Sequence, residues 1–172
     1  MRTHCGPQVA CARGDMEKIP LRRLATAVAA GTAAGLAGSL ALSGTEWLEQ
    51  KIIGRDHGHV GAEFVEKTTG AEPQTNDEVR LLDNAVHYSY GAAWGALRGA
   101  MGAFGIGGVP GFLLHWLGVD VAAKLFLPFF GLAPTIDKRR PRNLLIDTAH
   151  HGIYALAVGL LLGQMKKMGH SK

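Results

Sequence analysis

Long apolar runs separated by short charged segments dominate this chain. Four runs carry few charged residues: 24–44, 84–104, 109–131 and 144–163. A helix rises about 1.5 Å per residue, so about 20 residues cross a hydrocarbon core of about 30 Å. The pattern therefore predicts an all-α polytopic membrane protein with four transmembrane helices.

The segments between these runs carry helix start and stop signals. We expect residues 45–82 to form an interfacial linker, with Glu46 and Trp47 continuing the first helix to the headgroup level. Gly70 and Pro73 break the linker, and Thr75 to Glu78 has the pattern of a capping box that starts the next helix. The prolines of segment 134–141 break the chain again. Residues 1–18 are predicted to be a polar, disordered leader, and 19–172 the membrane domain.

An internal repeat links the second and fourth runs. Residues 81–99 and 145–163 share nine identities in nineteen positions, whereas shared composition predicts about two. We interpret this as a duplicated hairpin of two spans, repeated in parallel. The second and fourth spans must then run in the same direction, so the third must cross although it contains Asp120 and Lys124. These two residues stand at i and i+4 with the acid first, which favours an ion pair, either structural or functional within the membrane.

Small residues recur at every fourth position of three runs. The rows are Ala27, Gly31, Gly35, Ser39, Ser43 in the first run; Gly91, Gly95, Gly99 in the second; and Ala155, Gly159, Gly163 in the fourth. Such spacing allows helix backbones to approach closely in a membrane. It predicts a compact bundle and surplus small-residue faces that favour a homo-oligomer.

The second and fourth rows begin with polar residues, which are Asp83, His87, Asp147 and His151. Four interpretations are open. The aspartates can cap the interface and bond to the histidines one turn away, with Tyr90 and Tyr154 anchoring the same leaflet. The four side chains can form a divalent-metal site, with His150 as a further ligand. His87 and His151 can ligate haem, or these groups can relay protons.

Two other polar residues lie inside the predicted spans. Arg98 is the one charge of the second run, and we expect it to snorkel or to pair with a lipid phosphate. His115 lies in the middle of the third run beside Trp116, where we expect a hydrogen-bonded packing role.

Composition limits the classes of function. Glycine makes up 24 of the 172 residues, the net charge is +4 and the pI is about 9.3. The bases flank the spans, which fits anionic headgroups of a lipid bilayer and not nucleic acid. The positive-inside rule gives a near tie, because the basic loop 138–142 lies on the side opposite the termini. The first span is expected to set the orientation, with both termini cytoplasmic, and insertion in both orientations fits the tie as well. The chain has no nucleotide-binding loop, zinc-protease motif or serine elbow, so we do not expect an enzyme.

The order of features resembles the YagU-like family of small bacterial inner-membrane proteins, over roughly residues 22–163. The resemblance rests on the first span ending in Thr45-Glu46-Trp47, on the His87 and His151 segments, and on segment 127–134, Leu-Pro-Phe-Phe-Gly-Leu-Ala-Pro. It implies location and architecture but no residue roles. We expect a structural or accessory inner-membrane protein, or one that passes protons or a small solute. A metal- or haem-binding membrane protein is the alternative.

Overall fold

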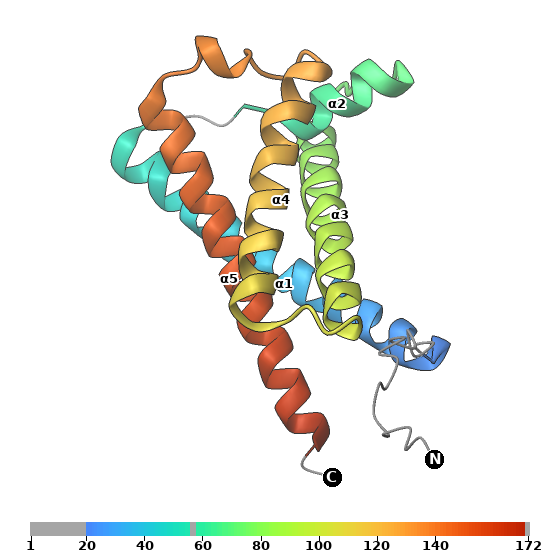
Figure 1. Ribbon diagram of the computed structural model, residues 1–172. Helices are drawn as coiled ribbons and strands as arrows, with labels where there is room; N and C mark the ends of the chain where they lie inside the picture. The colour runs from blue at the N-terminus through green and yellow to red at the C-terminus, as the bar shows by residue number, and fades with distance from the viewer. Residues whose placement is uncertain (1–19, 56–57, 171–172) are drawn as a thin grey trace, which may run out of the picture.

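The computed structural model describes residues 20–55 and 58–170, and this part of the chain is helical throughout its regular structure (Figure 1). The five α-helices are α1 (Leu21–Ile53), α2 (Val60–Thr69), α3 (Asn76–Ala103), α4 (Gly108–Phe129) and α5 (Pro141–His170), with a 3-10 turn at Ile136–Lys138. The all-α prediction is confirmed. The predicted leader, with Cys5 and Cys11, lies outside the described residues.

Three helices are long and apolar enough to cross a membrane: α1, α4 and residues Pro141–Met168 of α5. Their length and composition fit a multi-pass membrane protein. The second predicted span lies in α3, which is not among the three because its glycines, aromatic residues, His87 and Arg98 lower its apolarity. The structure therefore supports three of the four predicted spans on this criterion.

The distribution of exposed and buried side chains is the one expected for helices surrounded by lipid. Large apolar side chains on the membrane helices are exposed, and among them are Leu40, Leu114, Leu125 and Leu160. The buried positions include many small or polar residues, such as Gly31, Ser39 and Asp120. In water such an apolar exterior would promote aggregation, whereas in a bilayer lipid tails cover it.

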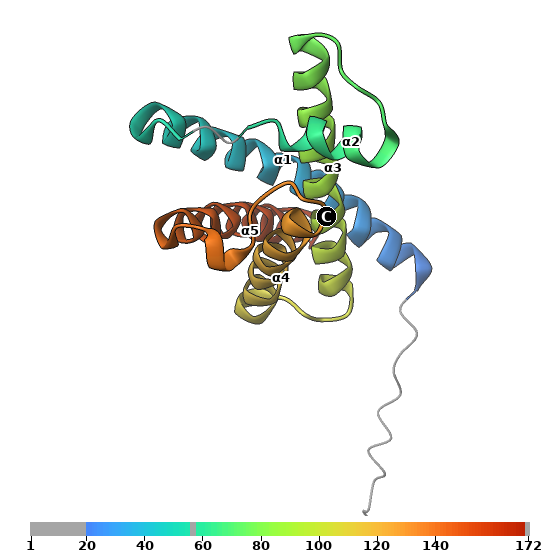
Figure 2. The same cartoon turned by 90° about the horizontal axis from the view of Figure 1, so that it is seen from above.

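The predicted small-residue rows of α1 and α3 meet each other. A Cβ atom added at Gly31 would lie 2.2 Å from the carbonyl oxygen of Gly95, and one added at Gly35 would lie 2.3 Å from that of Gly91. Ala27 contacts Gly99 in the same antiparallel register. No side chain larger than hydrogen fits at these glycines without separating the helices, so the spacing sets a backbone-to-backbone crossing, which is visible from above in Figure 2.

The apolar core lies where α5 crosses the other face of α1. It consists of Ala34, Val119, Tyr154 and Val158. A Cβ atom at Gly38 would lie 2.7 Å from Cγ2 of Val158, so α1 uses a second small face for this contact. Tyr154 is 2% exposed and its hydroxyl donates to the Gly91 carbonyl at 2.6 Å. The expectation that Tyr154 anchors the interface is therefore wrong: its ring fills the centre of the bundle.

The predicted linker is largely helical. α1 continues to Ile53, as expected from Glu46 and Trp47, and Gly70 ends α2 in the left-handed conformation. The capping box at Thr75 and Glu78 is confirmed. Helix α2 was not predicted. It covers the end of the bundle, where Phe64 packs on Phe126 and Phe130 with ring centroids 5.6 and 5.2 Å apart.

The helix directions agree with the prediction that the second and fourth runs point the same way. In Figure 1, α3 and α5 both begin at the end of the bundle near α2 and run toward the opposite end, while α1 and α4 run the other way. The segments that carry the predicted repeat therefore lie in two helices of the same direction.

Candidate functional site

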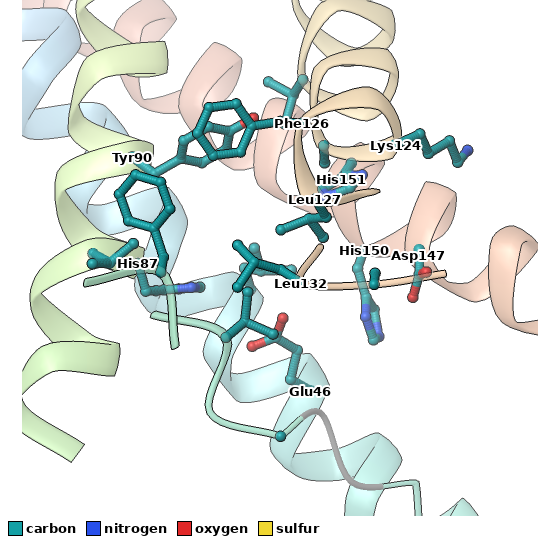
Figure 3. Close-up of a pocket in the computed structure, with 18 of the residues that line it drawn as sticks. Glu46, His87, Tyr90, Lys124, Phe126, Leu127, Leu132, Asp147, His150 and His151 are labelled. Atoms are coloured by element: carbon teal, nitrogen blue, oxygen red, sulfur yellow. The ribbon is translucent and has the colours of Figure 1, made fainter. Parts of the chain in front are cut away.

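A cavity of about 710 Å³ opens at the end of the bundle where α3 and α5 begin (Figure 3). All four predicted site residues of the Asp and His pairs line it: Asp83, His87, Asp147 and His151. In Figure 3, Glu46 and His150 lie below Leu132, whereas Tyr90 and Phe126 lie above it. The cavity thus has a polar part and an apolar part.

The Asp83 and His87 side chains have separate partners. Asp83 accepts hydrogen bonds from the Ala62 backbone N–H at 2.9 Å and lies 2.6 Å from Nδ1 of His59, so it fixes the start of α2. His87 lies 3.2 Å from the Ser43 hydroxyl on α1. The expected bond between Asp83 and His87 is wrong, because α2 and α1 bring partners that satisfy each side chain from outside the helix.

Asp147 belongs to a charged group at the mouth of the cavity. Arg55, just after α1, donates to Asp147 at 2.5 Å and to Glu49 at 3.2 Å. Burial opposes the charge of Arg55, but the hydrogen bond and the charge of Asp147 outweigh it, and the pKa of Arg55 lies above its ordinary value. Glu49 Oε2 also lies 3.7 Å from Nε2 of His150. The expected hydrogen bond between Asp147 and His151 is therefore wrong: Asp147 is bonded to Arg55 and His151 to Asp120.

His151 joins a buried ionic cluster between α4 and α5. Its Nδ1 lies 3.0 Å from Asp120 Oδ1, and Lys124 donates to Asp120 Oδ2 at 2.6 Å and to the Thr148 hydroxyl at 2.5 Å. The Asp120 side chain is 9% exposed. Asp120 and Lys124 thus pair at i and i+4, and the fold adds His151 to them.

The four residues considered as metal ligands do not form one ligand group. Asp83, Asp147 and His151 are each held by a different element, as described above. Within residues 20–55 and 58–170, no three His, Cys, Asp or Glu side chains lie together as a metal site would require. The haem alternative, with His87 and His151, stays a prediction.

Polar residues continue from this cluster into the bundle. Tyr154 follows His151 by one helical turn, and its ring centroid lies 5.5 Å from that of His115, which is 1% exposed. Farther along, Arg98 is 6% exposed and donates to the Ile106 carbonyl at 3.2 Å. The expectation that Arg98 snorkels or pairs with a lipid phosphate is wrong, because its side chain is buried and the turn between α3 and α4 supplies its acceptor.

The basic segment before α5 lines the other side of the cavity. Lys138, Arg139 and Arg140 all contribute to its wall. Arg139 Nε donates to the Pro134 carbonyl at 2.8 Å, while its Nη2 atom is buried without a hydrogen-bond partner among the described residues. These three bases and Arg55 were not predicted as site residues, because in the sequence they are indistinguishable from bases that flank a membrane span. The signal available for the three was Pro134 and Pro141, which mark a bend of the chain around them.

Comparisons of the chain with protein-family models, with curated proteins and with solved structures found no match.

Proposed function

We propose that the chain is a four-span membrane protein that passes protons through its helical bundle, and we place it in a bacterial inner membrane, as the YagU-like resemblance implies. The fourth crossing is α3. Because α1 and α4 run in the same direction, the chain between them has to return across the bilayer (Figure 1). With 28 residues, α3 reaches about 42 Å at 1.5 Å per residue, which suffices. Reporter fusions to the two termini should then report the same side, and opposite sides would refute the four crossings.

The observation that carries the proton proposal is a row of polar side chains behind the cavity: half-buried His151 with buried Asp120, then Tyr154 and then His115, which are both buried. Ionisable groups inside membrane helices are costly, and where they face the bundle interior they mark ion pathways and proton relays. Here each member faces other helices, since Asp120 and His115 are among the buried residues of α4.

The chemistry of the cluster suits a proton acceptor at the cavity. An imidazole bonded to a carboxylate can take up a proton from the cavity, because the carboxylate stabilises the imidazolium. Lys124 donates to Asp120 Oδ2 at 2.6 Å and so places a cation beside this carboxylate. His151 is therefore the residue that exchanges protons with the cavity, and Asp120 is the residue that orients and stabilises it.

Arg98 limits this passage at the far end. A fixed buried cation in a pore wall repels protons, as positive charges do in selective channels. Arg98 lies against α4 at Gly111, one turn from His115, where a Cβ atom would be 2.8 Å from Nη2 of Arg98. Neutralising Arg98 should therefore speed proton passage.

The test is proton flux into liposomes that contain the purified protein and a pH-sensitive dye, driven by a potassium diffusion potential. The intact chain should acidify the lumen faster than protein-free liposomes do. Asp120→Asn and His151→Gln should lower the rate at least about 10-fold, the range of general acid–base contributions, whereas Arg98→Gln should raise it.

Two variants serve as controls for the flux. Asp137→Asn and His59→Gln make the same chemical changes outside the polar row, and their rates should equal that of the intact chain. The opposite signs for positions 98 and 120 separate a relay from loss of fold, which lowers all rates together. A folded Asp120→Asn protein with the full rate, or an intact chain no faster than empty liposomes, would refute proton passage.

A further inference from the structure

We propose that the cavity and the groove beside it form a binding site for one anionic phospholipid, with the phosphate at Lys138–Arg140 and an acyl chain between α3 and α4. A lipid-binding site goes beyond the proposed proton passage, and lipid binding here does not require that the protein pass protons. The observations that carry it are the charges of the cavity wall and the continuity of the cavity with an apolar groove.

The charges of the cavity wall leave a surplus of cations. One of its carboxylates, Asp147, is neutralised by Arg55, and Asp83 is hydrogen-bonded to His59. The three consecutive bases of segment 138–140 make no ion pair with a carboxylate of the described chain. Among the described residues of the wall, Glu46 and Asp83 are the acids without a lysine or arginine partner. The cavity therefore favours an anion, and arginine at a buried edge is suited to phosphate oxygens.

Arg139 is the best placed of the three bases. Its Nε is fixed by the Pro134 carbonyl, which orients the guanidinium, and its Nη2 is buried with no acceptor in the described part of the chain. A buried guanidinium nitrogen without an acceptor costs free energy. A phosphate oxygen of a bound lipid would supply that acceptor once the guanidinium turns Nη2 toward the cavity, because the atom is covered in this conformation.

The second cavity provides room for a chain. It has a volume of about 470 Å³ and is lined by Tyr90, Trp94, Ala122, Leu125, Phe126 and Phe129, which lie on α3 and α4. Tyr90 and Phe126 line both cavities. The groove therefore begins at the apolar part of the polar cavity.

The direction of the groove matches a lipid standing in one leaflet. Phe129 is the last residue of α4, near the interface, and Ala122 lies about two turns deeper in the bundle. Trp94 likewise lies deeper along α3 than Tyr90. A headgroup at segment 138–140 thus has its acyl chain in the adjoining leaflet, with no charge in the groove.

Native mass spectrometry of the detergent-purified chain tests this site, with phosphatidylglycerol and phosphatidylcholine of identical acyl chains. The intact chain should bind phosphatidylglycerol about 10-fold more tightly, roughly the effect of one to two lost charge contacts. The variant Lys138→Gln/Arg139→Gln/Arg140→Gln should lose this preference. The control Lys51→Gln/Arg80→Gln/Arg142→Gln removes three exposed bases outside the cavity wall and should keep it.

The groove has its own variant and its own control. Ala122→Phe fills the groove and should weaken both lipids at least about 5-fold, whereas Val121→Phe, on the exposed neighbour, should not. Glycerol phosphate, which has the head but no chain, should bind far more weakly than either lipid. Equal binding of the two lipids, unchanged preference in the triple variant, or glycerol phosphate binding as tightly as the lipid would each overturn the proposal. Lipid binding is read without a membrane potential, so its failure is distinct from failure of proton flux.

Discussion

The α1–α3 and α4–α5 helix pairs are held together by opposite means. Between α1 and α3 the contacts are glycine backbone against glycine backbone, with Gly31 on Gly95 and Gly35 on Gly91. Between α4 and α5 they are polar: His151 lies 3.0 Å from Asp120, and Lys124 donates to the Thr148 hydroxyl at 2.5 Å. The first pair gains dispersion and weak Cα–H···O contacts over a tight surface, whereas the second gains a few strong charge-assisted bonds.

The two members of the sequence repeat show the same contrast. Gly95 of α3 is enclosed by α1, but its counterpart Gly159 in α5 has no described neighbour within 4 Å of an added Cβ atom. Tyr154 is buried, but its counterpart Tyr90 is 36% exposed. A shared pattern thus permits a contact without determining it, because the contact also requires a partner with a matching face.

Among these changes, removing the Asp120 carboxylate between α4 and α5 should have the largest effect on stability. Asp120→Ala leaves Lys124 with a buried charge and should lower the free energy of unfolding by about 3 kcal/mol, at the low end for a broken buried pair because the Lys124 side chain is 17% exposed. Denaturant unfolding in detergent measures it. The double variant Asp120→Ala/Lys124→Met removes both charges and should recover at least half of the loss. If the double variant is no more stable than the single one, the unpaired charge of Lys124 is not the cause of the lost stability.

A methyl group in the glycine contact should have an intermediate effect. Gly95→Ala places Cβ 2.3 Å from the Gly31 carbonyl oxygen, so the helices must separate, at a cost of about 2 kcal/mol. Gly159→Ala makes the same change in the repeat-related position, and there we expect a change within about 0.5 kcal/mol. The same unfolding measurement compares the two. Equal losses of unfolding free energy in the two variants would show that close packing against α1 is not what makes Gly95 sensitive to substitution.

Loss of one buried hydrogen bond should have the smallest effect. Tyr154→Phe removes the donor to the Gly91 carbonyl and should lower the free energy of unfolding by about 1 kcal/mol. Tyr90→Phe, at the exposed counterpart, should change it by less than about 0.5 kcal/mol. Thermal unfolding followed by tryptophan fluorescence can resolve this difference. If Tyr90→Phe is the more harmful variant, the assignment of Tyr154 to the core is at fault.

Local patterns predicted much of the fold. Apolar length identified α1, α4 and α5, the Thr75 capping box located the start of α3, and the small-residue rows predicted close backbone contact. These features depend on residues near one another in the chain, because capping, helix length and the face shared by i and i+4 are properties of a single helix. The missed helix α2 is short, and its stability comes from Phe64 packing on α4, which no local pattern contains.

Long helical, apolar segments, a possible pair of Asp120 with Lys124, and the helix faces shared by an aspartate and a histidine all follow from local residue order. The partner of each polar side chain depends on how the helices pack. Asp83 bonds to the start of α2, Asp147 to Arg55, and His151 to Asp120. The physical reason is that a carboxylate or an imidazole is satisfied by any suitable donor or acceptor within about 3 Å. Helices that cross or end nearby bring such groups from far along the chain.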